Sequence, residues 1–321
     1  MALLETDNLY VTYSEKKGFS GKEQVINAVN GVNLEIRKGE ILSIAGESGC
    51  GKSTLAKAIM KLVKIKSGDI LFEGKSIVNL KSQKDLRIFY QKVQMIFQNP
   101  YASLNPKMKI GEILKEPLEI NTKFSKKNMN EIVTKRLNDV GLDSSVVDLY
   151  PHEFSGGQRQ RIAIARALVL KPELISADEP VSALDASIQA QIINLIKDLK
   201  QNLNLTFLFI SHDLSVIRYI SDRVAVMYLG EIVEIGLTQE IFNSPKHPYT
   251  AALLSAVPKI GENNIKMQAL KGELPSPQNL PKGCKFHTRC PYAMDKCATN
   301  TPPEVIFSDF HVCKCFLYSD K

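Results

Sequence analysis

The chain of 321 residues contains no tryptophan, and aromatic residues make up only 7% of it. It has no apolar stretch near the roughly 18 residues that a membrane-spanning helix needs. Its first residues, MALLETD, lack the basic start and apolar core of a secretory signal. These absences predict a protein that stays in the cytosol. With 44% hydrophobic and 23% charged residues, the composition is that of a folded globular protein, and disorder is not expected.

Charge of one sign is not concentrated anywhere. Lysine and arginine number 41 against 34 aspartates and glutamates, which gives a formal net charge of +7. The lysines are spread along the sequence without long basic blocks. This spacing favours a solvated surface over a nucleic-acid or membrane-binding surface, so no nucleic-acid partner is predicted.

Cysteine is scarce but clustered. Of six cysteines, five lie within 32 residues: Cys284, Cys290, Cys297, Cys313 and Cys315. In a reducing compartment such a cluster indicates metal binding more than disulfides. The spacing does not match the paired C-x₂-C ligands of a zinc site, and four thiolates suit a four-iron cluster. Iron–sulfur, zinc and unliganded thiols all remain as interpretations of this cluster.

Three nearly continuous apolar runs, ILSIA, ELISA and LTFLFIS, predict buried parallel strands of an α/β sheet. The first run ends before a glycine-rich stretch, the second before Asp178, and the third before His212. Because sheets of this kind bind ligands at the carboxyl ends of their strands, these ends are the candidate site.

The remaining segments suggest how the chain is divided. Lysine-rich, helix-favouring sequence predicts an inserted helical subdomain over about 99–158. The alternating run RVAVMYLGEIVEIG predicts a hairpin around Gly230, and SEKKGFSGKEQ predicts a surface loop. Proline and cysteine become frequent after Pro258, which predicts one domain over 1–257 and an extension over 258–321.

The stretch GESGCGKST matches the phosphate-loop pattern G-x₄-G-K-[ST]. In this pattern, glycines let backbone N–H groups surround phosphates, the lysine reaches the β- and γ-phosphates, and the hydroxyl next to it binds Mg²⁺. A glycine-rich turn is the alternative, but a strand pattern precedes this stretch and a helical pattern follows it. The predicted nucleotide-binding residues are Gly46, Glu47, Ser48, Gly49, Cys50, Gly51, Lys52, Ser53 and Thr54.

The polar residues that follow the other predicted strands are of the types that ATP hydrolysis requires. Asp178 would hold Mg²⁺ through water, and Glu179 would orient or deprotonate the attacking water. His212 could contact the γ-phosphate, and Gln98 could bind Mg²⁺ or the water. Taken singly, the acidic pair could be a solvated turn and the histidine could be structural.

The stretch EFSGGQRQRIAIARAL offers a second anion site. Ser155, Gly156, Gly157 and Gln158 begin an apolar-striped run, as at a helix N-terminus, where N–H groups and the helix dipole favour anions. A simple helix cap is the alternative, although the motif FSGGQRQR extends beyond a cap.

Together these motifs resemble the ATP-binding subunits of ABC transporters over essentially the whole chain. The resemblance implies a phosphate-loop NTPase fold of the ABC cassette type, with Gln98 as Q-loop residue, Asp178 and Glu179 as the Walker B pair, SALD ending at Asp185 as the D-loop, and His212 as switch histidine. Two such subunits would close head to tail, so that residues 155–158 of one chain contact the ATP bound by the other. Tyr13 stands where the family places an aromatic residue that stacks on adenine; a core-facing strand tyrosine is the alternative.

Finer resemblance points to peptide importers. The segments FQNPYASLNPKMKIGEILKEPL, KHPYTAALLSAVP and PKGCKFHTRCPYA resemble oligopeptide and dipeptide importer ATPases of the F type, and nickel importers share much of this pattern. In this group the C-terminal cysteines ligate an iron–sulfur cluster, which implies a [4Fe–4S] site at Cys284, Cys290, Cys297 and Cys315. The extra Cys313 leaves the fourth ligand open.

The resemblance also implies partners and a location. The expected partners are a second homologous ATP-binding subunit, two transmembrane permease subunits and an extracytoplasmic peptide-binding protein, with this chain peripheral on the cytoplasmic face of the membrane. A soluble ABC ATPase without a transport role would need tandem cassettes or long coiled coils, and the chain shows one cassette and no sustained heptads. A regulatory module without turnover is disfavoured because Glu179 and His212 are present.

Overall fold

The computed structural model describes residues 2–17, 22–255 and 272–319. The chain divides into two compact units. Unit 1 comprises Arg37–Glu40 and Asn79–Ser211, and unit 2 comprises Ala2–Ile36, Ile41–Val78 and His212–Lys321. The predicted domain boundary at 257/258 lies outside the described residues.

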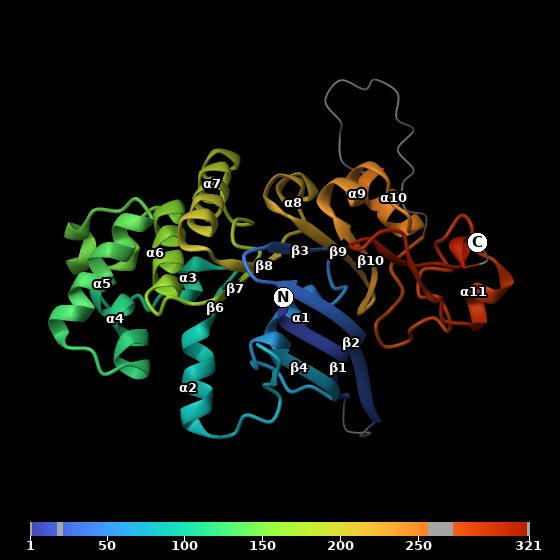
Figure 1. Ribbon diagram of the computed structural model, residues 1–321, viewed down its shortest axis with the longest axis horizontal. Helices are drawn as coiled ribbons and strands as arrows, with labels where there is room; N and C mark the ends of the chain where they lie inside the picture. Colours follow the sequence, from blue (N-terminus) through green and yellow to red (C-terminus); the bar gives the residue numbers. More distant parts are fainter. Residues whose placement is uncertain (1, 18–21, 256–271, 320–321) are drawn as a thin grey trace. The chain divides into compact units, whose positions relative to one another are not determined.

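Unit 1 combines parallel strands with a helical region, drawn in green in Figure 1. Its elements are α2 (Gln83–Lys92), β6 (Val93–Ile96), α3 (Pro100–Ser103), α4 (Ile110–Asn121), α5 (Lys126–Asp139), the 3₁₀ helices η1 (Ser144–Asp148) and η2 (Pro151–Glu153), α6 (Gly156–Leu168), β7 (Leu174–Asp178), α7 (Ala186–Leu203) and β8 (Thr206–Ile210).

The strands β6, β7 and β8 are parallel neighbours in unit 1. Met95 pairs with Ser176, and Ala177 pairs with Phe209. Every residue of β7 and β8 is buried, as their apolar sequences predict. Because β6 and β7 run in the same direction, their carboxyl ends lie at the same edge of the sheet. Gln98 follows β6 at this edge, and Glu179 follows β7.

Helices α4, α5 and α6 pack on one another in unit 1. Their contact buries aliphatic side chains such as Leu114, Leu118, Val133 and Leu137. Ser125 caps α5, because its hydroxyl accepts a hydrogen bond from the N–H of Asn128. The lysine-rich region after Gln98 is therefore helical, as the sequence predicts.

Unit 2 contains the remaining strands and helices. They are β1 (Ala2–Lys17), β2 (Lys22–Arg37), β3 (Ile41–Ala45), α1 (Lys52–Ile59), β4 (Ser67–Phe72), β5 (Lys75–Ser76), α8 (Leu214–Ile220), β9 (Arg223–Tyr228), β10 (Glu231–Leu237), α9 (Thr238–Asn243), α10 (Pro248–Ser255), α11 (Asp295–Thr299), β11 (Glu304–Ile306), β12 (Val312–Lys314) and the 3₁₀ helix η3 (Phe316–Tyr318).

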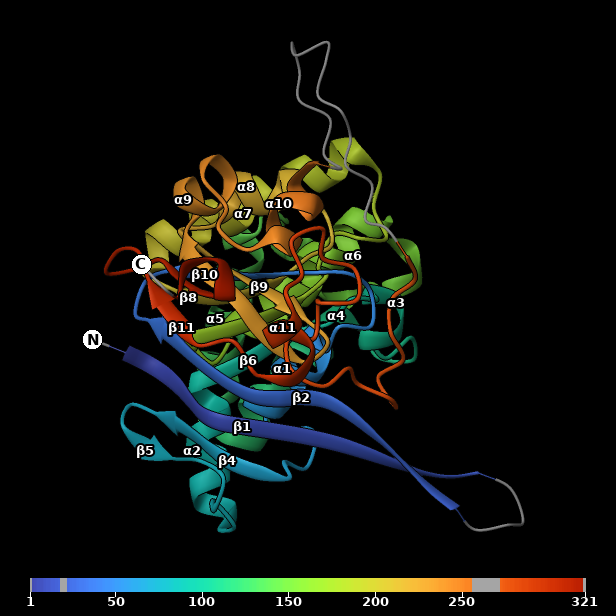
Figure 2. The ribbon, with the colours of Figure 1, turned by 90° about the vertical axis from the view of Figure 1, so that its right-hand side faces the viewer.

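One sheet of unit 2 has the strand order β2-β1-β4-β5, and Figure 2 shows β1 and β2 running side by side. Thr6 pairs with Ile70, and the register shifts between Asp7 and Tyr10. The predicted surface loop over residues 14–24 is wrong for most of its length, since β1 continues to Lys17 and β2 begins at Lys22.

The other sheet of unit 2 contains the run β11-β12-β10-β9-β3. β3 is parallel to β9, with Ser43 opposite Val224. β9 and β10 are antiparallel, which confirms the predicted hairpin; Leu229 and Gly230 make its turn with positive φ values of 44° and 86°. β12 adds to β10 by pairing Cys313 with Glu234, so the C-terminal segment is part of this sheet.

The core of unit 2 joins the strands to the C-terminal segment. Tyr228, Tyr249 and Phe286 are all fully buried, and their ring centroids lie 4.6 to 5.4 Å apart. Aromatic pairs at such separations stabilise a core beyond the effect of area alone. No helix in the described parts combines the length and apolar character that a membrane crossing requires.

Candidate functional site

The glycine-rich stretch forms the loop between β3 and α1 in unit 2. Gly46 has φ 152°, and a Cβ there would lie 2.3 Å from the carbonyl oxygen of Met227. Gly51 has φ 110°, and a Cβ there would lie 2.2 Å from the carbonyl oxygen of Ala28. Glycine is therefore required at both ends of the loop by backbone conformation and by close approach.

Lys52 lies inside this loop and is only 5% exposed. Its Nζ donates hydrogen bonds to the carbonyl oxygens of Gly46 at 2.8 Å and Glu47 at 2.9 Å. The loop main chain thus wraps around the ammonium group. Ser53 and Thr54 follow on the first turn of α1, where backbone N–H groups and the helix dipole favour an anion.

Asp178 and Glu179 lie at the carboxyl end of β7 in unit 1. Asp178 is buried as the last strand residue. Glu179 adopts the left-handed conformation with φ 46°, and its N–H donates to the carbonyl oxygen of Ile210 at 2.9 Å. A non-glycine residue in this conformation costs roughly 1–3 kcal/mol and is found most often at functional sites. The backbone here turns sharply and sets the direction of the Glu179 side chain.

Gln98 and Glu179 are in direct contact. Nε2 of Gln98 donates a hydrogen bond of 2.9 Å to Oε2 of Glu179, although the residues are 81 positions apart. Gln98 follows β6, and Glu179 follows the neighbouring parallel strand β7. The structure therefore brings together two of the three residues, Gln98, Glu179 and His212, that the sequence predicts to be catalytic.

The second predicted anion site begins α6 in unit 1. Ser155 is its N-cap: its hydroxyl accepts from the N–H of Gln158, whose side chain accepts from the N–H of Ser155. Such a reciprocal pair is a capping box. Ser155 and Gln158 are exposed, whereas Gly157 is buried, and a Cβ there would lie 2.5 Å from Cγ2 of Ile188 on α7. The glycine at 157 therefore has a packing role within the chain.

The other predicted residues are placed as follows. His212 is exposed and belongs to unit 2, two positions after β8 ends. Tyr13 lies on β1 with its side chain 39% exposed, so it is not a core-facing tyrosine. The phosphate loop, His212 and Tyr13 belong to unit 2, while Gln98, the acidic pair and residues 155–158 belong to unit 1.

Two residues that sequence reasoning missed hold Glu47 in the loop. The carboxylate of Glu47 forms an ion pair with Arg289, and its N–H donates to the hydroxyl of Tyr249 at 2.9 Å. The only signal in the sequence is that Arg289 and Tyr249 lie in segments that resemble peptide importers, HTRCPYA and KHPYTAALL.

The four predicted cysteine ligands line one small cavity in unit 2: Cys284, Cys290, Cys297 and Cys315. Cys313 does not line it; it is fully buried on β12 opposite Glu234. Burial raises the pKa of the Cys284 thiol to about 11, which disfavours the thiolate that binds metals.

The fit of this cavity to a cluster is partial. The donor set of four thiols is the one that a four-iron cluster takes. The cavity measures about 10 Å³, which is room for one water at most. Within residues 2–17, 22–255 and 272–319, no group of three or more His, Cys, Asp or Glu side chains is arranged to hold a metal ion. The described geometry thus supplies ligands without the space for a cluster.

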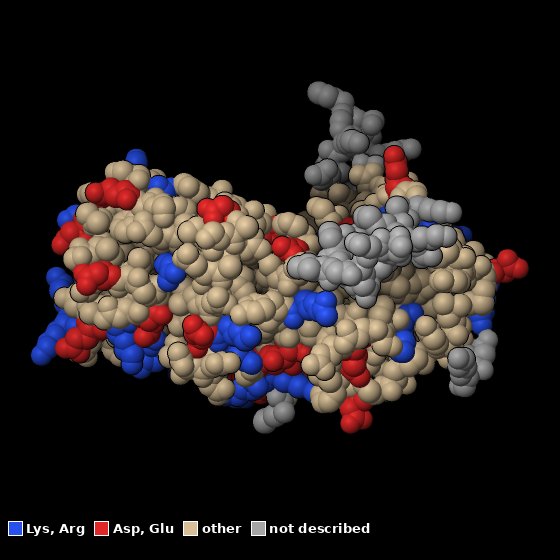
Figure 3. Space-filling view, turned by 90° about the horizontal axis from the view of Figure 1, so that it is seen from above, with Lys and Arg blue, Asp and Glu red and all other residues tan. Residues whose placement is uncertain are grey.

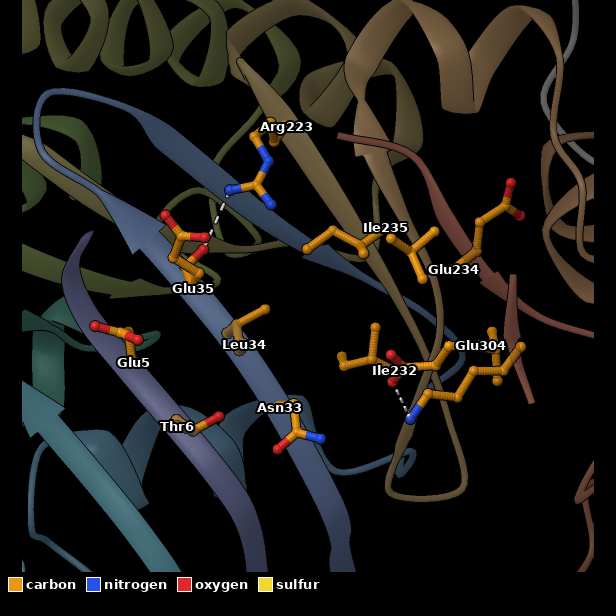
Figure 4. A pocket seen from close by; sticks show the side chains of 13 residues that line it. Glu5, Thr6, Asn33, Leu34, Glu35, Arg223, Ile232, Glu234, Ile235 and Glu304 are labelled. Atoms are coloured by element: carbon orange, nitrogen blue, oxygen red, sulfur yellow. Dashed lines mark hydrogen bonds and ion pairs between the residues drawn. The ribbon is translucent and has the colours of Figure 1, made fainter. Parts of the chain in front are cut away.

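A larger cavity of about 290 Å³ opens in unit 2, lined by residues of β1, β2 and the strands β9 to β12 (Figure 4). Arg223 donates there to the carbonyl oxygen of Glu35 at 3.1 Å, and Lys314 pairs with Glu304 at 3.1 Å. No residue of the predicted ATP site is among its described lining residues. Because its described lining contains none of the predicted ATP-site residues, this cavity is not the candidate site.

Surface charges of both signs are interspersed on the face drawn in Figure 3, without one continuous basic patch. This distribution agrees with the spread of lysines along the sequence.

Comparison with known proteins decides the family. The oligopeptide transport ATP-binding protein AppF of Bacillus subtilis is 52% identical over 304 residues, which cover 94% of this chain and 92% of that protein. This chain belongs to the ATP-binding subunits of oligopeptide and dipeptide ABC transporters. OppF of Salmonella typhimurium, an oligopeptide transport ATP-binding protein, is 50% identical over 94% of this chain and 92% of its own length.

A second family match covers the C-terminal part. Residues 29–182 match the ABC transporter family, and residues 233–297 match the oligopeptide/dipeptide transporter C-terminal region. The dipeptide transport ATP-binding protein DppF of Haemophilus influenzae is 49% identical over 98% of this chain and 96% of its own length. The C-terminal match ends at Cys297, before Cys313 and Cys315, so it does not choose between these two cysteines.

Solved structures confirm the predicted fold class, an α/β ABC ATP-binding cassette. The ATP-binding cassette MJ0796, in a dimeric post-hydrolysis state bound to ADP and Pi, matches with a TM-score of 0.65 and 30% identity over 73% of this chain and 98% of that one. CbiO1 from Clostridium perfringens, part of the ABC transporter complex cbiONQ, matches with a TM-score of 0.65 and 28% identity over 76% and 91%.

Proposed function

We propose that this chain hydrolyses ATP to drive the import of oligopeptides or dipeptides through a membrane complex that it does not itself span. The observation that carries the proposal is identity near 50%, over almost the full length, to subunits named for oligopeptide and dipeptide transport. In addition, residues 233–297 match the C-terminal region of oligopeptide/dipeptide transporters, which is not expected of a soluble ABC ATPase of another class.

Each predicted site residue would have its own role in ATP binding or hydrolysis. Backbone N–H groups of residues 46–54 and the Lys52 ammonium would bind the phosphates of ATP, and Tyr13 would stack on its adenine. Ser53, Gln98 and Asp178 would hold Mg²⁺, which neutralises phosphate charge when bound. Glu179, oriented by Gln98, accepts a proton from the attacking water, and His212 contacts the γ-phosphate.

Transport requires partners. Ser155, Gly156, Gly157 and Gln158 would face the ATP bound by a second homologous ATP-binding subunit. The corresponding residues of that subunit would face the ATP bound by this chain. Two permease subunits and an extracytoplasmic peptide-binding protein would complete the importer, with this chain on the cytoplasmic face. A nickel importer is the alternative within the same family.

The test is growth of a bacterium that needs one amino acid and has lost its own peptide-importer ATPase of this type. Supplying the chain with its cognate permeases should restore growth on di- or tripeptides containing that amino acid. Lys52→Ala should not restore growth, because losing charge-assisted contacts to phosphates weakens ATP binding by about tenfold to a hundredfold. Restored nickel uptake without peptide uptake would contradict the peptide assignment.

We further propose that Cys284, Cys290, Cys297 and, as the fourth ligand, Cys315 bind a [4Fe–4S] cluster, for which the cavity between them would have to widen beyond about 10 Å³. The support is that Cys315 lines the same cavity as Cys284, Cys290 and Cys297, whereas Cys313 faces Glu234. Protein purified without oxygen should be brown, with about four irons per chain. Cys315→Ser should release most of the iron, while Cys313→Ser, an equally conservative change two residues away, should retain it.

Iron analysis and visible absorbance of both variants check this prediction. Stoichiometric zinc without colour would overturn the iron–sulfur assignment. Loss of iron from Cys313→Ser with retention in Cys315→Ser would assign the fourth ligand to Cys313 instead.

A further inference from the structure

The side chain of Glu47, the second residue of the phosphate loop, is held by an arginine 242 positions away. Nη1 of Arg289 lies 2.8 Å from Oε2 of Glu47, and Nη2 lies 3.1 Å from Oε1. The side chain of Arg289 is 6% exposed and that of Glu47 is 24% exposed. This two-point contact is the strong, geometrically specific form of an arginine–carboxylate pair.

The main chain of Glu47 is held as well. Its N–H donates to the hydroxyl of Tyr249, and its carbonyl oxygen accepts from Nζ of Lys52. Glu47 is therefore fixed at three points, and one of these is the lysine predicted to reach the phosphates. A shift of residue 47 would move a carbonyl group that positions the Lys52 ammonium.

Arg289 belongs to a short segment that also packs on the core of unit 2. Phe286 lies three residues before it, within 5.3 and 5.4 Å of the ring centroids of Tyr228 and Tyr249. Cys284 and Cys290, on either side, line the cysteine cavity. The segment 284–290 therefore links the cysteine cavity to the phosphate loop through one buried guanidinium.

We propose that Arg289 is a positioning residue for the phosphate loop, through which the C-terminal segment sets the affinity of this chain for ATP. Arg289 acts in two ways. It fixes residue 47, and it neutralises a carboxylate that would otherwise stand within the loop that binds a polyanion. The inference rests on the proposed function only in requiring that this loop binds ATP.

The experiment titrates the full chain with a fluorescent ATP analogue and records thermal unfolding of the same samples. Arg289→Ala should lower nucleotide affinity about tenfold, a size typical of changes within a coupled network. Lys285→Ala is the matched control: it removes a basic side chain from the same segment, where Lys285 pairs with Glu231 at 3.9 Å. Its nucleotide affinity should equal that of the wild type.

Two further variants test whether Arg289 positions the phosphate loop or only stabilises the fold. Adding Glu47→Gln to Arg289→Ala should recover part of the lost affinity, because the uncompensated negative charge is gone. Arg289→Lys, which keeps the charge but loses the two-point contact, should lower affinity about threefold. If Arg289→Ala proves too unstable to measure, this lysine variant decides the question.

The proposal would be overturned if Arg289→Ala, or Arg289→Lys in its place, bound the nucleotide as tightly as Lys285→Ala within experimental error. This holds even if the Arg289 variant melts at a lower temperature. Failure of Glu47→Gln to recover any affinity would overturn the charge component. A wild-type chain that does not bind the nucleotide would instead refute ATP binding itself, so the two failures are distinguishable.

Discussion

Replacing Glu179 by glutamine is expected to lower hydrolysis of the ATP bound by this chain at least a hundredfold while leaving its ATP affinity within about twofold of the wild type. The loss is expected because glutamine cannot accept a proton from water. Binding is retained because the substitution leaves the loop at residues 46–54 untouched. Glutamine has nearly the same shape, so the left-handed turn at residue 179 and the contact with Gln98 keep their geometry.

Steady-state phosphate release by an importer whose partner subunit cannot hydrolyse ATP, and a nucleotide titration, measure the two quantities separately. Glu173→Gln is the control, because Glu173 directly precedes β7, and its ion pairs are with Lys38 and Lys92 at the surface. That variant should hydrolyse ATP at nearly the wild-type rate. Wild-type turnover in Glu179→Gln would show that another group activates the water.

How much of this site follows from the sequence depends on whether the relevant interactions are local. The strand β7, the hairpin of β9 and β10, and the cap at Ser155 follow from runs of neighbouring residues, and each lies where the pattern predicts it. Local patterns suffice here because the spacing of buried residues, the residue preferences of turns and the capping of helices each depend on only a few neighbouring positions.

The features that were missed depend on residues distant in sequence. The contact of Gln98 with Glu179 arises only once β6 and β7 pair, and the pair of Glu47 with Arg289 spans most of the chain. The packing role of Gly157 was missed as well, because Ile188 on α7, which a Cβ at residue 157 would meet, lies in a later segment of the chain. The extension of β1 to Lys17 and the start of β2 at Lys22 were missed because charged, glycine-containing sequence favours a loop until a neighbouring strand stabilises it.

The N-terminus of α6 gives a different kind of prediction, because its proposed ligand is bound by another subunit. Ser155→Arg should reduce hydrolysis at the partner's ATP site by about a hundredfold, the scale of losing donors that stabilise a developing charge. Arginine removes the exposed hydroxyl and adds bulk where the γ-phosphate would approach. Nucleotide binding at Lys52 of this chain should be unchanged.

The measurement uses the assembled importer with Glu179→Gln in this chain, so that remaining turnover comes from the partner's site. Ser125→Arg is the matched control, because Ser125 is the exposed N-cap of α5 and its hydroxyl accepts from the N–H three residues on, as that of Ser155 does. Both substitutions therefore cost a cap worth about 1 kcal/mol. Only Ser155→Arg should stop the partner's site; equal activity of the two variants would refute the contact of residues 155–158 with ATP bound by another subunit.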